Sequence, residues 1–458
     1  MSTQNAVTPA SLLSQALSSL RAAKDAATSG VWPTFTGTCK SSMLSMLKSI
    51  QIGQLTIVTG DEMHTFGTED ETRPPVVLRV LNDNFWARLV LRSDLGLSEA
   101  YMKEEIKINN LAGFIKLFLE NRDHLADGTS SYNLIFNSLD VIMHSRLANT
   151  INNSINNISA HYDLGNDMFA EFLDPTMTYS SGVWQSPTDT LEEAQIRKLS
   201  LMIEKAQIEA RDHVLEIGTG WGSFAILAAK TTGCRVTSLT LSKEQKLLAE
   251  DRIRAAGLSD RIEVLLCDYR NLDPATHQFD KIVSIEMVEA VGAEFMPTYF
   301  ECAHRLLHPE HGIFAIQAIT MPESRYAAYR KGVDFIRKYI FPGGECPTVT
   351  TLTEAAHVGS KGHLVLDHLE NYPTDYARTL QVWRENFMLK FDKFAATQTH
   401  VTNEQGFPVY DDVFKRKWEY YFAYCEGAYA TRTLGLVQMV FSRMANPRLI
   451  KRTIGYNL

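Results

Sequence analysis

The chain has 458 residues and a formal net charge of −8, from 45 Lys and Arg against 53 Asp and Glu, and 45% of its residues are hydrophobic. This composition is that of a globular protein, and it excludes a disordered chain, a disulfide-stapled mini-protein and a basic nucleic-acid binder. The six Cys include no C-x-x-C pair, so we expect no zinc or redox motif and no metal. No window holds about 20 apolar residues and the first 20 residues lack signal-peptide features, so we expect a cytoplasmic protein without a membrane span.

The first third of the chain predicts a small domain at residues 46–140, after a flexible or helical segment at 1–45. Residues 52–92 hold apolar runs between Gly-Asp and Asn-Asp-Asn turn signals, so we predict strands there. Residues 95–125 predict a helix, because apolar residues recur on one face: Leu111, Phe114, Ile115, Phe118 and Leu119.

A larger second domain is predicted at residues 141–458. From 190 to 320, helical segments alternate with the apolar runs HVLEIG, RVTSLTL, IEVLLCD, KIVSIEM and GIFAIQAI. Strand–helix alternation implies βαβ crossovers and a buried parallel sheet, so the predicted fold class is α/β with a Rossmann-like sheet. Residues 321–458 are rich in aromatic residues and predict helical insertions and C-terminal helices.

The segment VLEIGTGWGSF (214–224) predicts a ligand site where a strand meets a helix, because glycines let the backbone approach a ligand closely. A dinucleotide site is the first rival. However, the spacing is not G-x-G-x-x-G, and no acidic residue ends the next strand to bind a ribose. Thr240, Ser242 and Gln245 would supply polar contacts instead, and Asp268 ends a third strand. This combination is similar to that of class I S-adenosylmethionine-dependent methyltransferases.

Further segments make the resemblance narrower. HYDLGNDMFAEFLDPTMTYSSGVW (161–184), IEMVEAVG (285–292), FIRKYIFPGGECP (335–347), YARTLQVWRENF (376–387) and YYFAYCEGAYATRTLGLVQMVFSR (420–443) resemble cyclopropane-fatty-acyl-phospholipid synthases and mycolic acid cyclopropane synthases. GQLTIVTGD and GLSEAYMKEEI resemble the small N-terminal domain of the longer members. The resemblance implies cofactor contacts from Tyr179, Ser180, Glu216, Gly218, Thr219, Gly220, Thr240, Leu241, Ser242, Gln245, Asp268 and Tyr269.

The reaction implied by the resemblance moves a methyl(ene) group from S-adenosylmethionine to the cis double bond of an unsaturated phospholipid acyl chain. The product is a cyclopropane or a methylene- or methyl-branched chain. An alkene is a poor nucleophile, so the enzyme must align it with the methyl group and exclude water. A substrate held in a bilayer requires transient peripheral membrane contact, for which the amphipathic 111–119 segment is one candidate. A homodimer is left open.

A base must then remove a proton from the methylated chain. In the family that base is thought to be a bound bicarbonate, held by Glu, His, Cys, Ile and Tyr positions. Glu289, Ile319 and Tyr376 match this set, whereas Ser181 replaces the Cys and Gln317 replaces the His. Both replacements keep hydrogen-bonding capacity. The two hypotheses are a rebuilt anion pocket that still binds bicarbonate and a direct base role for Glu289.

Two more residues and two alternative functions remain open. Glu286 adds a carboxylate three residues before Glu289, on the same face if the segment is helical. Cys425 matches a Cys proposed for the family's active site, with a buried structural thiol as the alternative. The alternative functions are a small-molecule amine N-methyltransferase of the same fold and a catalytically impaired, lipid-binding pseudoenzyme.

Overall fold

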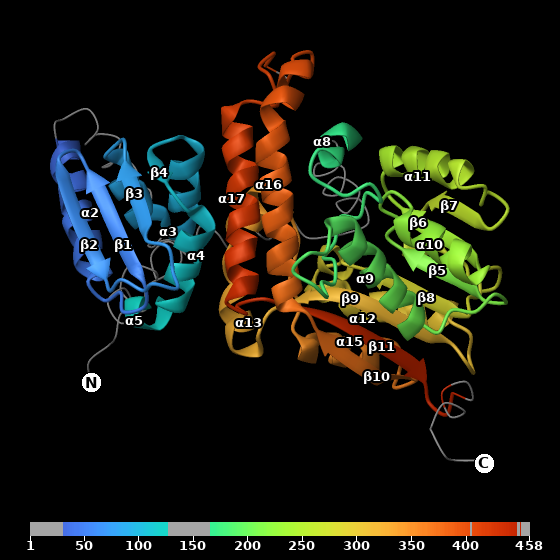
Figure 1. The fold of residues 1–458 in the computed structure, drawn as a ribbon. Helices are drawn as coiled ribbons and strands as arrows, with labels where there is room; N and C mark the ends of the chain where they lie inside the picture. Colours follow the sequence, from blue (N-terminus) through green and yellow to red (C-terminus); the bar gives the residue numbers. More distant parts are fainter. Residues whose placement is uncertain (1–30, 127–164, 404, 447–448, 450–458) are drawn as a thin grey trace, which may run out of the picture. The chain divides into compact units, whose positions relative to one another are not determined.

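The computed structural model describes residues 31–126, 165–403, 405–446 and 449 (Figure 1). The chain divides into two compact units, residues 1–142 and 143–458. The predicted boundary between residues 140 and 141 lies outside the described residues. So do residues 1–30 of the predicted N-terminal segment and the first four residues of the 161–184 motif.

The N-terminal unit is a four-stranded sheet with helices. Its strands are ordered β2-β1-β3-β4, and β1 is antiparallel to β2 but parallel to β3. The alternating burial of β1 shows that one face of this sheet packs inward. The elements are α2 (Val31–Leu47), β1 (Gln54–Thr59), β2 (Glu62–Gly67), β3 (Val76–Val80), α3 (Asn84–Met102), β4 (Ile106–Ile108), α4 (Leu111–Glu120) and α5 (Arg122–Ala126).

The strand prediction for residues 52–92 is correct as far as Val80 and wrong beyond it. The apolar run that follows lies in α3, because the Asn-Asp-Asn signal starts a helix instead of turning a hairpin. The side chain of Asn82 accepts a hydrogen bond from the backbone N–H of Asn84 at 2.9 Å. A short apolar run is compatible with either structure, and the side-chain-to-backbone turn at Asn82 favours the helix. The helix predicted over 95–125 is likewise interrupted by β4.

The apolar face of α4 is packed into the N-terminal unit. Leu111, Phe114 and Ile115 are buried, and Phe118 and Leu119 are partly buried. Asn121 fixes the end of the helix by accepting hydrogen bonds from the backbone N–H groups of Gln51 and Ile52. The 111–119 segment is therefore a core element, and the expectation that it contacts a membrane is corrected.

The second unit contains a seven-stranded sheet ordered β10-β11-β9-β8-β5-β6-β7. Five strands are parallel, and β11 runs antiparallel to both of its neighbours. The α/β prediction with a Rossmann-like sheet is confirmed. The strands are β5 (His213–Ile217), β6 (Arg235–Thr240), β7 (Ile262–Leu266), β8 (Lys281–Ile285), β9 (Ile313–Thr320), β10 (Leu364–Asn371) and β11 (Gly435–Arg443).

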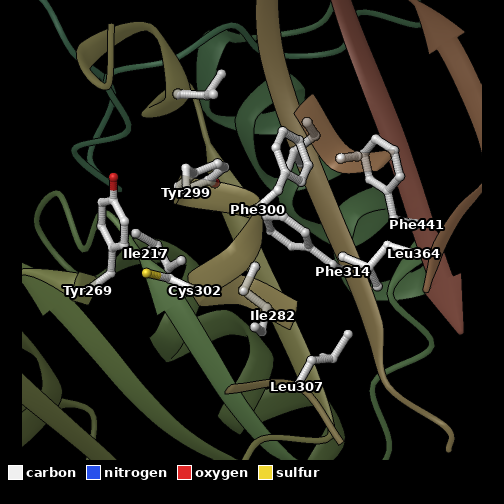
Figure 2. Close-up of a cluster of buried hydrophobic side chains, with 14 of the residues drawn as sticks. Ile217, Tyr269, Ile282, Tyr299, Phe300, Cys302, Leu307, Phe314, Leu364 and Phe441 are labelled. Carbon is white, nitrogen blue, oxygen red and sulfur yellow. The ribbon is translucent and has the colours of Figure 1, made fainter. Parts of the chain in front are cut away.

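Two apolar layers cover the two faces of this sheet, because successive strand residues point to opposite sides. Leu215 belongs to the layer beneath α12 and α15, and Val214 to the layer beneath α9, α10 and α11. Figure 2 shows part of the first layer, where Phe300, Phe314 and Phe441 lie close together. The helices that take part are α9 (Leu191–Lys205), α10 (Ser223–Thr232), α11 (Lys243–Ala255), α12 (Met296–Leu306) and α15 (Val349–Gly359).

The remaining helices border the carboxyl ends of the strands. The two long helices α16 and α17 pack against each other (Figure 1). The prediction that residues 321–458 are helical is correct for these helices and wrong for β10 and β11, which extend the sheet. The helices are α8 (Asn166–Ala170), α13 (Glu323–Tyr329), α14 (Phe335–Tyr339), α16 (Pro373–Thr397) and α17 (Asp412–Ala430), with short 3₁₀ turns η1 (Tyr269–Asn271), η2 (Val288–Ala290) and η3 (Ala293–Phe295).

Candidate active site

A cavity of about 190 Å³ lies at the carboxyl ends of β5, β6, β7 and β8. This is the edge of a parallel sheet where α/β folds bind ligands. Eleven of the twelve residues predicted for the cofactor line it: Tyr179, Ser180, Glu216, Gly218, Thr219, Gly220, Thr240, Leu241, Gln245, Asp268 and Tyr269. Ser242 does not line the cavity. Its hydroxyl caps α11 by accepting from the backbone N–H of Gln245, so it positions a residue that does.

The glycine turn after β5 gives the cavity its open wall. The backbone N–H groups of Gly218 and Thr219 both donate to the carbonyl of Leu239, which ties the turn to β6. Gly220 has φ +52°, and a Cβ added there would meet nothing within 4 Å. The turn is thus fixed on one side and leaves free space on the other, as close approach of a ligand to the backbone requires.

Two acidic side chains border the same cavity. Glu216 accepts a short hydrogen bond from Ser238, and burial raises the pKa of Glu216 to about 8. A cationic ligand group beside this carboxyl would favour its charged form, which suits the ammonium and sulfonium of S-adenosylmethionine. Asp268 is held at the wall by Arg270, whose guanidinium donates to both carboxylate oxygens at 2.8 and 2.5 Å.

A buried lysine on α9 was missed by the sequence analysis. Lys198 lines the cavity, is fully buried, and donates to the hydroxyl of Ser180 at 2.5 Å. Burial lowers the pKa of Lys198 to about 8, against the opposing effect of the carboxylates of Glu286, Asp174 and Glu216. The signal was present in the sequence, because Lys198 shares its helix face with apolar residues: Leu191, Ala194, Leu199 and Met202.

The carboxylate of Glu286 stands at the centre of the group predicted to hold an anion. Its Oε1 accepts from the backbone N–H of Ser181 at 2.8 Å and from Nε2 of Gln317 at 2.7 Å. Its Oε2 accepts from the hydroxyl of Tyr376 at 2.6 Å. Ser181 takes part through its backbone only, because its hydroxyl donates to the carbonyl of Gly182. Glu286 lines the cavity, whereas the other residues of this group do not.

Glu289 lies half-buried beside this cluster and does not line the cavity. One carboxylate oxygen accepts a short hydrogen bond from the backbone N–H of Ile319, and the other has no partner among the described residues. Burial, and then the charge of Glu286, raise the pKa of Glu289 to about 8. Burial also raises the pKa of Glu286, but its three hydrogen-bond donors and the charge of Lys198 oppose that shift and favour the carboxylate form.

The predicted helical face shared by Glu286 and Glu289 is not formed. Glu286 has φ +49°, and only a 3₁₀ turn follows it.

Cys425 lies on α17, away from the cavity lining, and burial raises the pKa of its thiol well above the usual range. This placement favours the structural-thiol alternative for Cys425.

Replacing Glu289 by Gln should change how stability depends on pH. The carboxyl has a pKa of about 8 in the folded protein and an ordinary pKa of 4.5 in the unfolded chain, so its contribution to stability is fully present below pH 4.5. That contribution is lost as pH rises towards 8, because the unfolded chain releases the proton first. We therefore expect the free energy of unfolding of the variant, relative to wild type, to rise between pH 5 and pH 8 in denaturant titrations.

The matched control for this measurement is Glu354→Gln, at an exposed position on α15. Its stability relative to wild type should be the same at both pH values. A pH-independent difference for Glu289→Gln as well would show that Glu289 is ionised in the folded protein throughout this range.

Comparison with known proteins identifies relatives over most of the chain. The family model described as mycolic acid cyclopropane synthetase matches residues 149–439. Tuberculostearic acid methyltransferase UfaA1 of Mycobacterium tuberculosis is 43% identical over 300 residues, which cover 64% of this chain and 66% of that protein. Cyclopropane-fatty-acyl-phospholipid synthase of Escherichia coli K12 is 35% identical over 381 residues, covering 81% and 88% respectively.

Solved structures agree with this assignment. The cyclopropane synthase MmaA2 from Mycobacterium tuberculosis superposes with a TM-score of 0.56 at 27% identity, over 63% of this chain and 98% of that one. The mycolic acid cyclopropane synthase CmaA1, complexed with SAH and CTAB, gives 0.55 at 28% identity over the same shares. With the family model matching most of the second unit, these similarities show that the chain belongs to the mycolic acid cyclopropane synthetase family of S-adenosylmethionine-dependent methyltransferases.

Proposed function

We propose that this protein transfers a methyl(ene) group from S-adenosylmethionine to the cis double bond of an unsaturated phospholipid acyl chain. The product is a cyclopropane or a methylene- or methyl-branched chain. The observation that carries the proposal is that the carboxylate of Glu286 borders the same cavity as the glycine turn at Gly218 and Gly220. A methyl donor on the turn and a base on the carboxylate would then act on one substrate.

An aromatic wall next to the carboxylate supports an apolar substrate. Tyr179 lines the cavity, packs against Trp383 at 5.3 Å between ring centroids, and shares a hydrogen bond with Tyr421 at 3.0 Å. Tyr376 stacks on Tyr429 at 4.4 Å. Such a wall excludes water, and its ring faces stabilise the positive charge that develops on an alkylated alkene.

The chain's own residues then have defined tasks in this proposal. S-adenosylmethionine supplies an electrophilic methyl group. The turn at Gly218 and Gly220 places it, with Glu216 facing its positive charge and Asp268 and Gln245 offering polar contacts from neighbouring strands. Alignment of the acyl chain between the turn and the aromatic wall is the main contribution to rate, because the alkene is weakly nucleophilic.

The phospholipid substrate is proposed from the Escherichia coli relative, whose name gives a cyclopropane-fatty-acyl phospholipid as its product and which matches both units of this chain. Among the described residues no helix is long and apolar enough to cross a membrane. We therefore propose that the enzyme reaches acyl chains by transient contact with the bilayer surface.

The test is an assay of the purified protein with S-adenosylmethionine, using vesicles of unsaturated phospholipid in parallel with a panel of small amines. We expect the acyl chains to gain one CH₂ group by mass spectrometry, with the fragment pattern distinguishing a ring from a branch. Methylated amines with unchanged lipid would establish an amine N-methyltransferase instead. Tight cofactor binding without turnover of any unsaturated lipid would establish a pseudoenzyme.

A further inference from the structure

The three hydrogen-bond donors around Glu286 are already used by its carboxylate. A carboxylate and a bicarbonate ion share the same planar pair of acceptor oxygens, so one pocket of donors suits either. Here the donors from Ser181, Gln317 and Tyr376 lie 2.6–2.8 Å from Glu286. A second anion in the same place would find no free donor among these groups and would be repelled by Glu286. Bicarbonate therefore does not fit this pocket.

The direction of the Gln317 amide is fixed by a chain of hydrogen bonds that begins at Lys205. An ammonium group only donates, and Lys205 donates to Oε1 of Gln438 at 2.5 Å. Nε2 of Gln438 must then donate to Oε1 of Gln317, at 2.8 Å, and Nε2 of Gln317 is left to donate to Glu286. This chain of hydrogen bonds therefore fixes the amide of Gln317 so that its N–H donor faces Glu286.

The backbone at Glu286 is strained, which is a second sign of a specific role. Its φ of +49° lies in the left-handed region, where a residue with a side chain costs roughly 1–2 kcal/mol. The backbone N–H of Glu286 donates to the carbonyl of Gln317 at 2.8 Å and holds this conformation. Glycine would occupy the position without strain, so the side chain is retained at an energetic cost, as at many functional sites.

We propose that the carboxylate of Glu286 occupies the anion position and is itself the base that receives the proton, so that the reaction needs no dissolved bicarbonate. This inference rests on the proposed function. The π electrons of the alkene form a bond to the methyl carbon as the carbon–sulfur bond breaks, leaving a carbocation on the acyl chain. A C–H bond of the new methyl group then breaks, its electron pair bonds to the cationic carbon to close the ring, and the proton moves to Glu286. If a hydride first shifts from the methylated carbon to the cation, loss of the same proton to Glu286 forms the methylene instead.

The experiment compares wild type with Glu286→Gly and Glu286→Gln in degassed, bicarbonate-free buffer, with and without added bicarbonate. Wild-type turnover should not depend on bicarbonate. Glu286→Gly should lose at least about 100-fold in turnover and recover part of it when bicarbonate enters the vacated pocket. Glu286→Gln should lose as much without recovery, because the amide fills the space and cannot take the proton.

The matched control is Glu104→Gly, at an exposed glutamate with φ +57° in the N-terminal unit. It relieves the same kind of backbone strain and should leave turnover and bicarbonate dependence unchanged. Wild-type turnover that falls when bicarbonate is removed, or normal turnover of Glu286→Gln, would overturn the assignment of Glu286 as the base.

A binding measurement separates this inference from the proposed function. In carbon-13 NMR with labelled bicarbonate, the wild type should not bind the ion, whereas Glu286→Gly should bind it. This result is expected whatever the substrate, so it remains informative if no lipid is turned over. Saturable binding of bicarbonate to wild type that Glu286→Gly abolishes would overturn the inference while leaving the lipid methyltransferase activity untouched.

Discussion

Replacing Gly220 by Leu is expected to abolish binding of S-adenosylmethionine while leaving the fold intact. The Cβ at this position would enter open space in the cavity, so a leucine side chain would fill the volume that the cofactor needs without striking the protein. The positive φ adds roughly 1–2 kcal/mol of strain, which a domain with this large a core tolerates. Calorimetric titration should show affinity weakened by at least about 100-fold, equivalent to about 3 kcal/mol.

The control for this variant is Gly257→Leu, where φ is +70° and a Cβ would also meet nothing within 4 Å. Gly257 follows α11 and is exposed, so Leu there imposes similar backbone strain away from the cavity. It should bind the cofactor like wild type. Normal affinity in a folded Gly220→Leu protein would remove this turn from the cofactor site.

Replacing Lys198 by Met is expected to reduce turnover strongly at neutral pH and to restore part of it at higher pH. The buried ammonium offsets the negative charge of Glu286, and Asp174, Glu216 and Glu289 are the other carboxyls near these two groups. Loss of an adjacent opposite charge raises a carboxyl pKa by about 1–3 units. Turnover at pH 7 should therefore fall with the ionised fraction of Glu286, by up to about 1,000-fold, as each unit of pKa above the working pH is a factor of 10.

The measurement is a pH–rate profile, in which the acid limb of Lys198→Met should move to higher pH. Lys230→Met is the control, because Lys230 is exposed on α10, and its profile should match that of wild type. If Lys198→Met lowered turnover equally at every pH, the lysine would be packing the site and not tuning the charge of Glu286.

The alternation of strands and helices in residues 190–320 was sufficient to predict the Rossmann-like sheet, because each segment has its own turn or cap. The capping box between Thr190 and Glu193, for example, sets the start of α9. The antiparallel strands β10 and β11 were not predicted. Strand β11 is buried along nearly its whole length, so it lacks the alternation that distinguishes a strand from a helix.

The cofactor side of the site was largely predicted because its residues follow strand ends in sequence. The proposed base was predicted only in part: the sequence grouped Gln317 and Tyr376 around Glu289, whereas in the structure both donate to Glu286. The sequence suggested Glu289, which lies three residues after Glu286. Of these two glutamates, only Glu286 lines the cavity. A positive φ at a glutamate cannot be read from sequence, and it is what turns Glu286 towards the cavity.

The chain of amides from Lys205 has a consequence for how relatives of this protein can diverge. Lys205 is also paired with the half-exposed Glu370 on the edge strand β10, so the direction of the buried amide hydrogen bonds is set at the edge of the sheet. If position 205 became a residue that only accepts hydrogen bonds, both glutamines would turn round, and Gln317 would present an oxygen to an anion. Sequences that differ at one of positions 205, 286, 317 and 438 should therefore differ at the others, a covariation that links the outer edge of the sheet to its catalytic centre.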